Sequence, residues 1–381
     1  MATIEIKKVE TKKDLRRFID VHHDLYEGNP YDAPTLVLDD LNTFNPKKNA
    51  AFEFCEAEFY IAYKDGKAVG RVAAIINHRA NEKWNQHNVR FGWIDFIDDI
   101  EVSKALLKAV EDYGRRKGMK QIVGPLGFTD MDPEGMLIEG FDQLGTMATS
   151  YNYDYYPKHI EQMGGWEKDN DYVEYKLIIP DKMPEKYEKI SKMVMQRYNL
   201  RIKKLTYKDI YKKGYGLKVF KVINETFKDL YGYSEMTDKQ IMQYINMYMP
   251  MADLSLFVVI EDASADNKVV GIGLTMPSMS RALQKCKRGR LFPFGWWHLL
   301  RSMKFHKTDY VDLLLMGVLP EYRNKGANAL MFYDLIPRYQ AYGFEWGESS
   351  VEMETNANVQ SQWQYIEREQ HKRRRCYKKS L

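Results

Sequence analysis

One weak internal repeat constrains the fold more than any other feature of the sequence. A predicted strand at 4–9 and the amphipathic helix after it recur as a strand at 200–205 and a helix at 217–227. A hairpin follows in each half, and the Val-Gly pairs of its return strands lie at 69–70 and 270–271, an offset of 201 residues. The sequence therefore predicts two copies of one α/β or α+β unit.

Both copies continue with a third strand, a helix that ends near a glycine, and a further strand. The ranges are 91–97, 102–117 and 121–123 in the first copy and 311–318, 328–342 and 349–354 in the second. A stretch with two prolines at 178–185 predicts the linker. The length of 381 residues suits two domains, which we place at 1–179 and 180–381. The segment 278–307 is then an insertion in the second domain.

Composition narrows the class of protein. Hydrophobic residues are 44% and charged residues 29%, which favours a globular chain over a disordered, collagenous or membrane-spanning one. The first ten residues lack the apolar core of a secretory signal. Cys55, Cys286 and Cys376 lie far apart in the sequence, which favours a reduced protein of the cytoplasm. A net charge of +4 is too small to indicate nucleic acid, and no membrane partner is expected either.

The stretch 313–330 carries the clearest chemical signal. It predicts a buried strand, a turn at Pro320, and a basic loop with a glycine that opens a helix. Backbone N–H groups at such a helix start, beside Arg323 and Lys325, predict a site for a phosphate or pyrophosphate. No Walker A sequence occurs there. The alternative is that Gly326 only begins a tight helix and that the cations are solvated.

The same stretch resembles the acyl-CoA motif of the GNAT superfamily, the acetyl-CoA-dependent N-acetyltransferases. The matching positions are Val318, Pro320, Tyr322, Arg323 and Gly326. Asn328 stands where the family has Gly or Ala. The resemblance covers about 186–381 and implies two tandem GNAT-like domains. Each would have a mixed, mostly antiparallel twisted sheet flanked by helices.

The resemblance also implies the cofactor-binding residues. The motif strand would be splayed from its neighbour, so that the main chain of Met316 and Val318 pairs with the pantetheine arm of acetyl-CoA or another acyl-CoA. Asn356 would open the family's late helix. The pyrophosphate would be held by Arg323, Asn324, Lys325, Gly326, Ala327 and Asn328.

The catalytic positions match the family less closely. Glu352 and Glu354 alternate with apolar neighbours, so one is a candidate general base and a solvent-facing strand is the alternative. Tyr365 lies seven residues after Asn358 and is the candidate acid, with a packed tyrosine as the alternative. Counting instead from Asn356 gives Trp363, which is a poor proton donor. The eight histidines show no metal-ligand spacing, so no metal is expected.

Three further segments complete the predictions. In the first half, carboxylates at 98–101 replace the basic loop, so that copy should bind no CoA. The aromatic and basic stretch 290–301 could be a lid or pocket floor, an interfacial membrane helix, or a packed insertion. The cationic tail 371–379 is expected to be a terminal strand with its cations on an outer face, in preference to a nucleic-acid patch.

Together these features predict an N-acyltransferase. It would transfer acetyl from acetyl-CoA to a primary amine of a small molecule or peptide by direct attack. The alternative is a non-catalytic CoA-binding or interaction protein on the same scaffold.

Overall fold

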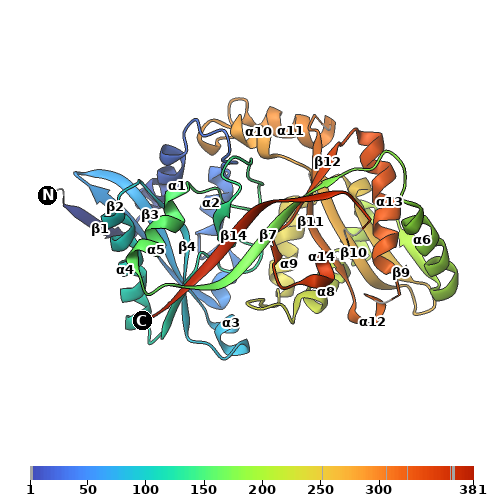
Figure 1. Cartoon of the computed structure of the whole chain (residues 1–381), viewed down its shortest axis with the longest axis horizontal. Coiled ribbons are helices and arrows are strands. Elements are labelled where there is room, and N and C mark those ends of the chain that lie inside the picture. Colours follow the sequence, from blue (N-terminus) through green and yellow to red (C-terminus); the bar gives the residue numbers. More distant parts are fainter. Residues whose placement is uncertain (1–2, 251, 306, 324, 361, 363–364) are drawn as a thin grey trace. The chain divides into compact units, whose positions relative to one another are not determined.

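The computed structural model describes residues 3–250, 252–305, 307–323, 325–360, 362 and 365–381. The chain forms two compact units, and each draws on segments that are distant in the sequence (Figure 1). The first unit consists of Met1–Val173, Ser280–Leu299 and His371–Leu381. The second consists of Glu174–Met279 and Leu300–Gln370. No helix in the described ranges is long and apolar enough to cross a membrane.

Helices and strands alternate along the chain in the order that the repeat predicts. The first 163 residues form β1 (Ile4–Lys8), α1 (Lys12–Leu25), α2 (Val37–Thr43), η1 (Ala50–Glu53), β2 (Cys55–Lys64), β3 (Lys67–Asn77), α3 (His78–Lys83), β4 (Asn88–Phe96), α4 (Ile100–Arg116), β5 (Gln121–Gly124), β6 (Met136–Glu139) and α5 (Tyr155–Met163). The next residues, to Pro277, form β7 (Glu167–Ile178), α6 (Glu185–Tyr198), β8 (Leu200–Lys203), α7 (Tyr207–Lys212), α8 (Tyr215–Phe227), α9 (Asp238–Tyr248), η2 (Leu254–Leu256), β9 (Phe257–Asp262) and β10 (Lys268–Pro277). The remainder forms α10 (Ser280–Gln284), η3 (Lys287–Gly289), α11 (Gly295–Phe305), β11 (Tyr310–Val318), α12 (Pro320–Arg323), α13 (Ala327–Tyr342), β12 (Trp346–Ser349), β13 (Glu352–Met353), α14 (Ala357–Gln360) and β14 (Arg368–Ser380).

The two units have sheets of the same design. In the first unit the strand order is β1-β2-β3-β4-β5-β14, and in the second it is β8-β9-β10-β11-β12-β7. In each sheet the fourth and fifth strands pair parallel, and the other printed pairings are antiparallel. This confirms the predicted mixed, mostly antiparallel sheets flanked by helices.

The sixth strand of each sheet comes from the other half of the sequence. Lys176–Ile178 of β7, at the end of the first half, pair with β12 in the second unit. Tyr377–Ser380 of β14, at the end of the second half, pair with β5 in the first unit. The segment 280–299, which lies within the predicted insertion 278–307, also belongs to the first unit.

In the first unit, helices cover both faces of the sheet, and side chains that alternate along each strand pack against them. In β3, Val72, Ala74 and Ile76 join a core that includes residues of α4 and α5. Ala73 and Ile75 point to the opposite face and join Phe18 and Ile19 of α1. Strands that are apolar on both faces suit a sheet with two helical layers.

The cationic tail differs from its prediction. Lys372 and Arg374 are each only 1% exposed, so they do not lie on an outer face. The Lys372 ammonium donates to the carbonyl of Leu144 at 3.1 Å, and the Arg374 guanidinium donates to that of Ser150 at 2.5 Å. These carbonyl partners lie more than 200 positions away in the sequence, where a local charge pattern carries no information about them.

Candidate functional site

The fourth and fifth strands of the second unit separate partway along their length. β11 pairs with β12 from Tyr310, opposite Trp346, to Leu313, opposite Ser349. From Leu314 onward, β11 has no strand partner on that side within the described part of the chain. The backbone of Leu314–Met316 therefore has no strand partner along this edge of β11 within the described residues.

A β-bulge explains the separation. The pairing of β10 with β11 shifts at this point, because Leu274 lies opposite Leu315 while the next residue, Thr275, lies opposite Leu313. Leu314 is thus the extra residue, and a bulge bends its strand and increases its twist. On β12, the hydroxyl of Ser349 accepts from the N–H of Tyr175 on β7 at 2.8 Å.

The loop after β11 places the start of α13 at the end of the free edge of β11. Leu319 donates its N–H to Val270 at 2.9 Å, which holds the turn against β10. The short helix α12 follows, and its Tyr322 hydroxyl donates to Asp262 at 2.7 Å. Burial and the neighbouring carboxylate raise the pKa of Tyr322 to about 12, so the phenol remains a donor at neutral pH.

Gly326 is required by both its conformation and its surroundings. Its φ of +81° lies in the left-handed region that favours glycine. A Cβ at this position would lie 2.8 Å from Ile190 Cγ2 and 3.1 Å from Val194 Cγ2, both on α6. Figure 1 shows α6 and α13 side by side. The glycine thus lets α13 begin tightly against α6.

The first turn of α13 presents polar groups that have no partners among the described residues. Ala329 is the first residue of this turn to donate its N–H into the helix, to Gly326 at 3.0 Å, and no side chain caps the start. The side-chain oxygen of Asn328 is buried and accepts no hydrogen bond from any described residue. Free N–H groups at the start of this helix of 16 residues favour a nearby anion.

The two cations of the loop occupy different positions. The Arg323 guanidinium donates to the carbonyls of Val318 and Thr226, both at 3.1 Å, and so ties β11 to the end of α8. The Lys325 ammonium lies over the rings of Tyr322, at 4.1 Å, and Tyr198, at 5.5 Å. Arg323 therefore positions the loop, while Lys325 has no carboxylate partner within the described residues. Asn324, which the sequence also assigned to this loop, lies outside them.

Met316 and Val318, the two strand residues assigned to pantetheine, differ in burial and in their contacts. Met316 is half-buried, and its side chain lies 3.3 Å from the position that a Cβ on Gly273 would take. The Val318 side chain is buried, and its carbonyl accepts from Arg323. The free edge of β11 therefore lies chiefly along Leu314–Met316. Ala327 is fully buried in the first turn of α13.

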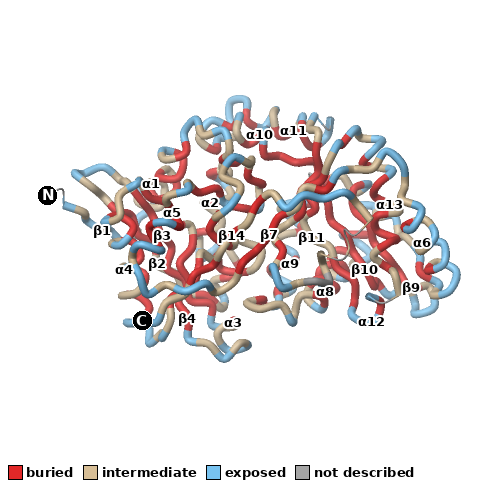
Figure 2. Tube along the Cα trace, viewed as in Figure 1, coloured by how far each residue is buried: buried red, intermediate tan, exposed pale blue. Residues whose placement is uncertain are grey.

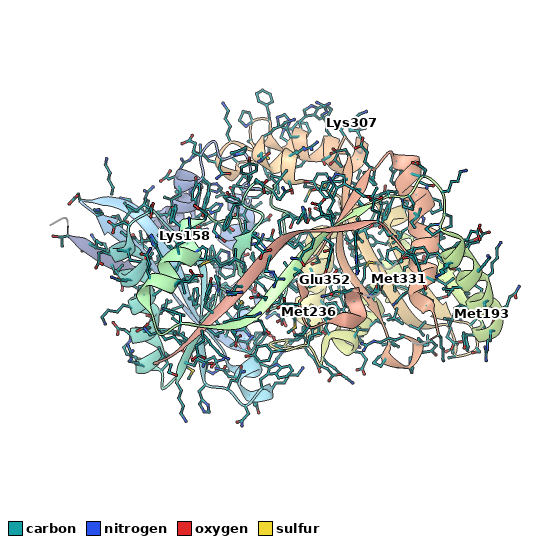
Figure 3. The ribbon with its side chains drawn as sticks, in the orientation of Figure 1. Lys158, Met193, Met236, Lys307, Met331 and Glu352 are labelled. Atoms are coloured by element: carbon teal, nitrogen blue, oxygen red, sulfur yellow. The ribbon has the colours of Figure 1, made fainter. Side chains whose placement is uncertain are left out.

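The two candidate bases lie beside the strand separation. Glu352, labelled in Figure 3, is on β13, which pairs with β7. Only 7% of Glu352 is exposed. Glu354 is exposed, and its backbone carbonyl accepts from the side chain of Gln360 at 3.1 Å. Of the two candidate bases, Glu352 is therefore the buried one and Glu354 the exposed one.

The late helix begins where the sequence placed it. The side-chain oxygen of Asn356 accepts from the N–H of Val359 at 3.4 Å, a weak cap for α14. Tyr365 is half-buried, with its ring edge-on to Tyr187 at 5.5 Å and below the Lys186 ammonium at 4.7 Å. Trp363 lies outside the described residues, and Asn358 is described only as part of α14.

Sequence reasoning missed two buried carboxylates. Asp312 on β11 pairs in register with Glu348 on β12, and each is 2% exposed. They lie one position before the last pair of the two strands, Leu313 with Ser349. A carboxylate inside an apolar strand was the available signal, but only the register of the parallel pair shows that the two are neighbours.

The first unit has the same strand separation but closes it with its own side chains. Phe96 pairs with Gly70 as Val318 pairs with Gly271. The N–H of Phe96 donates to the Tyr156 hydroxyl at 2.9 Å, and its carbonyl accepts from the Tyr155 hydroxyl at 2.7 Å. At the start of α4, the Asp99 carboxylate accepts from the N–H of Glu101 at 3.0 Å. The backbone groups that would hold a pantetheine and a pyrophosphate are thus already satisfied.

A buried charged cluster lies beside this closed separation. His22 lies 3.1 Å from Asp95 and 3.4 Å from Asp32, and the Arg71 guanidinium donates to Asp95 at 2.7 Å. Burial opposes the charged imidazole, but the two carboxylates outweigh it and raise the pKa of His22 to about 10. The adjoining cavity has a volume of about 40 Å³, enough for only a few water molecules. No cluster within the described ranges has the donors of a metal site.

No protein-family model matches the chain. Two curated proteins resemble it over nearly their whole lengths. The bacterial ceramide synthase of Caulobacter vibrioides is 23% identical, over 100% of this chain and 98% of that protein. Protein YghO of Escherichia coli is 26% identical, over 97% of this chain and 94% of that protein.

Solved structures show the same architecture. A tandem GNAT protein from the clavulanic acid biosynthesis pathway, determined without acetyl-CoA, superposes with a TM-score of 0.56. It is 10% identical, over 99% of this chain and 98% of that one. A GCN5-related N-acetyltransferase from Sphaerobacter thermophilus gives 0.51 at 10% identity, over 99% and 95%. The chain has the tandem GNAT fold.

Proposed function

We propose that the chain is an acyl-CoA-dependent N-acyltransferase whose second unit binds the cosubstrate. One observation carries the proposal: the free edge of β11 beyond Leu313 leads directly to the uncapped start of α13. The pantetheine arm of CoA is extended, contains amides and ends in a pyrophosphate. Its amides match the free edge, and its pyrophosphate matches the helix start that follows. The full-length similarity to an N-acyltransferase, the Caulobacter ceramide synthase, supports the same activity.

The residues present fit a CoA thioester. The free edge of Leu314–Met316 can pair with the pantetheine amides, and the uncapped start of α13 can hold the pyrophosphate. When bound, the thioester supplies an acyl carbon that is activated towards an amine. The short contacts around Gly326 leave no room for a larger residue in this loop.

Proton transfer is assigned to residues of the second unit. As the amine attacks, a C–N bond forms and the C–S bond breaks, so the nitrogen loses a proton and the departing sulfur gains one. We assign Glu352 as the proton acceptor because it is buried on β13, with Glu354 as the exposed alternative. Tyr365 is assigned as the proton donor. The neighbouring pair Asp312 and Glu348 is the next candidate for the acceptor if Glu352 is dispensable.

The acceptor is proposed to be a primary amine, and the acyl group need not be acetyl. A ceramide is the amide of a fatty acid with a long-chain amino alcohol, and the Caulobacter relative is named for making it. Long-chain acyl-CoAs and long-chain amino alcohols therefore belong in the test beside acetyl-CoA, small amines and peptides.

A ligand series followed by a product assay tests the proposal. CoA, acetyl-CoA and longer acyl-CoAs should raise the melting temperature, since a ligand at 100 times its Kd adds about 2.7 kcal/mol to the unfolding free energy. Amide formation should then be measured over the amine panel with the parent chain, Glu352→Gln and Glu354→Gln. Binding without product over the whole panel would favour the non-catalytic CoA-binding alternative. The absence of any CoA-dependent shift would refute the proposed cosubstrate site.

A further inference from the structure

The segment before and within α11 gathers exposed aromatic side chains. Twelve large hydrophobic residues are exposed in the described part of the chain, and five of them lie between 292 and 305. Phe292 and Phe294 are the most exposed of all, at 77% and 70%, and Trp296, Trp297 and Phe305 are between 42% and 55% exposed. Figure 2 shows this stretch as largely exposed. We call these five residues the aromatic patch.

The aromatic patch lies on α11 and the turns before it, which are packed against the rest of the chain. The buried residues of α11 (Gly295, Leu299, Ser302 and Met303) recur at helical spacing, so they share one side of the helix, and most of the patch residues of the helix lie on the other. The preceding turns are fixed to the first unit, because the Gln284 side chain donates to the carbonyls of Pro30 and Asp32, and Arg288 pairs with Asp24 at 2.6 Å. The aromatic side chains are therefore held out on a fixed element.

Within the segment that carries the patch, the charged residues have one sign, and outside it Asp20 and Asp24 of α1 pair with Arg288. No Asp or Glu occurs between positions 267 and 308, while eight Lys or Arg residues lie between 281 and 307. Arg301, Lys304 and Lys307 are exposed in or directly after α11, and none pairs with a carboxylate within the described residues. Lys307 is labelled in Figure 3. A partner that covers this face must accept aromatic rings and supply negative charge.

An anionic lipid surface satisfies both requirements. Tryptophan and phenylalanine favour the boundary between headgroups and acyl chains, and each Lys or Arg near an anionic leaflet adds attraction. With 11 residues, α11 is too short to span a bilayer and can only lie along it. A self-association surface would need matching negative charge in the second copy of the patch, and this segment contains none.

We propose that the aromatic patch and its flanking cations dock the protein on an anionic bilayer surface. The rings of Phe292, Phe294, Trp296 and Trp297 enter the headgroup boundary, and Arg301 and Lys304 contact the headgroup phosphates. This inference goes beyond acyl transfer and does not depend on it, since vesicle binding is measured without any CoA or amine.

Vesicle flotation with the full chain tests the docking. Vesicles of phosphatidylcholine alone are compared with vesicles that contain 30% phosphatidylglycerol as the anionic lipid. The aromatic variant is Phe292→Ser with Phe294→Ser, and its control is Leu38→Ser, which removes a 52% exposed apolar residue elsewhere. The charge variant is Arg301→Glu with Lys304→Glu, and its control is Lys12→Glu with Lys13→Glu at the start of α1. Melting temperatures confirm that each variant is folded.

The outcomes separate docking from its alternatives. We expect binding to anionic vesicles that falls about tenfold or more in both the aromatic and the charge variant, with both controls unchanged. Loss in the charge variant alone would overturn insertion of the rings and leave simple electrostatic adsorption. No vesicle binding, with a concentration-dependent dimer that the aromatic variant abolishes, would overturn the proposal in favour of self-association.

Discussion

At the scale of single residues, the two cations of the 320–326 loop should behave differently when neutralised. Arg323 joins two backbone carbonyls, whereas Lys325 lies only over aromatic rings. Arg323→Gln should cost about 1.5 kcal/mol of folding stability, the lower range for hydrogen bonds from a charged group, and should weaken CoA binding. Lys325→Gln should leave the melting temperature within a degree or two and weaken CoA binding about fivefold, equivalent to about 1 kcal/mol.

Denaturant unfolding and CoA titration calorimetry on the same two variants decide this prediction. Equal losses of stability would show that the hydrogen bonds of Arg323 contribute nothing to the loop. Unchanged CoA affinity in both variants would place the pyrophosphate elsewhere.

His22 should make the free energy of unfolding fall steeply as the pH rises above neutrality. Its pKa is about 10 in the folded chain and about 6.5 when unfolded, so the folded state holds the extra proton between these values. This contribution is complete below pH 6.5 and is lost as the pH rises through 10, with a slope of up to about 1.4 kcal/mol per pH unit. His22→Gln should flatten the slope between pH 7 and 10 in urea unfolding. His78→Gln, a change at a surface histidine, should not, and an unchanged slope in His22→Gln would contradict the assignment.

The pKa of the neighbouring His23 is shifted in the opposite direction, downwards. Burial, followed by the positive charge of His22 and Arg71, lowers the pKa of His23 to about 3. Its contribution is present above pH 6.5 and is lost as the pH falls towards 3. Near neutral pH His22 is therefore charged and His23 neutral, and protonation of His23 destabilises the folded state only as the pH falls below 6.5.

At the scale of elements, the two glycines that bound α13 form a matched pair of test sites. Gly326 and Gly343 have φ values of +81° and +75°, so alanine at either should cost about 1–2 kcal/mol from backbone strain. Only at Gly326 would the new Cβ meet neighbours, at 2.8 Å and 3.1 Å on α6, while nothing lies within 4 Å at Gly343. Gly326→Ala should therefore displace the start of α13 and weaken CoA binding, whereas Gly343→Ala should lower stability alone.

Thermal unfolding and CoA titration of both variants check the comparison. If Gly343→Ala weakened CoA binding as much as Gly326→Ala, the effect would come from general helix strain and not from the geometry of the loop.

Local sequence was sufficient to predict most elements of both sheets. The hairpins at 58–75 and 256–274 carry alternating patterns and turn residues, which are local signals, and they correspond to β2–β3 and β9–β10. The bulge at Leu314 and the adjacency of Asp312 and Glu348 could not be predicted, because both depend on register between strands. The prediction that the tail cations lie on an outer face was wrong for a related reason. The partners of Lys372 and Arg374 are backbone carbonyls at 144 and 150, which are distant in the sequence.

At the scale of the whole molecule, the exchange of terminal strands makes each half of the sequence incomplete. The sixth strand of the first unit is β14, whose Tyr377 is buried in the core with α4 and β5. Asp171 adds a link, because Arg373 and Arg375 of β14 both donate to its carboxylate, at 3.1 Å and 2.8 Å. The first half alone would expose the edge of β5 together with the apolar surface that Tyr377 covers, and such an edge favours aggregation.

A fragment of residues 1–179 should therefore not fold cooperatively, although the internal repeat taken by itself would make it a complete domain. The matched variant attaches 368–381 to this fragment through a flexible glycine-serine linker, which restores the antiparallel partner of β5. We expect the linked fragment to show dispersed amide resonances and slow hydrogen exchange at 121–124, and the bare fragment to show neither. A bare fragment that unfolds cooperatively with the melting temperature of the linked one would mean that the exchanged strand is dispensable. In that case the predicted boundary at 179–180 would mark an autonomous domain, and the strand exchange would matter only for joining the two halves.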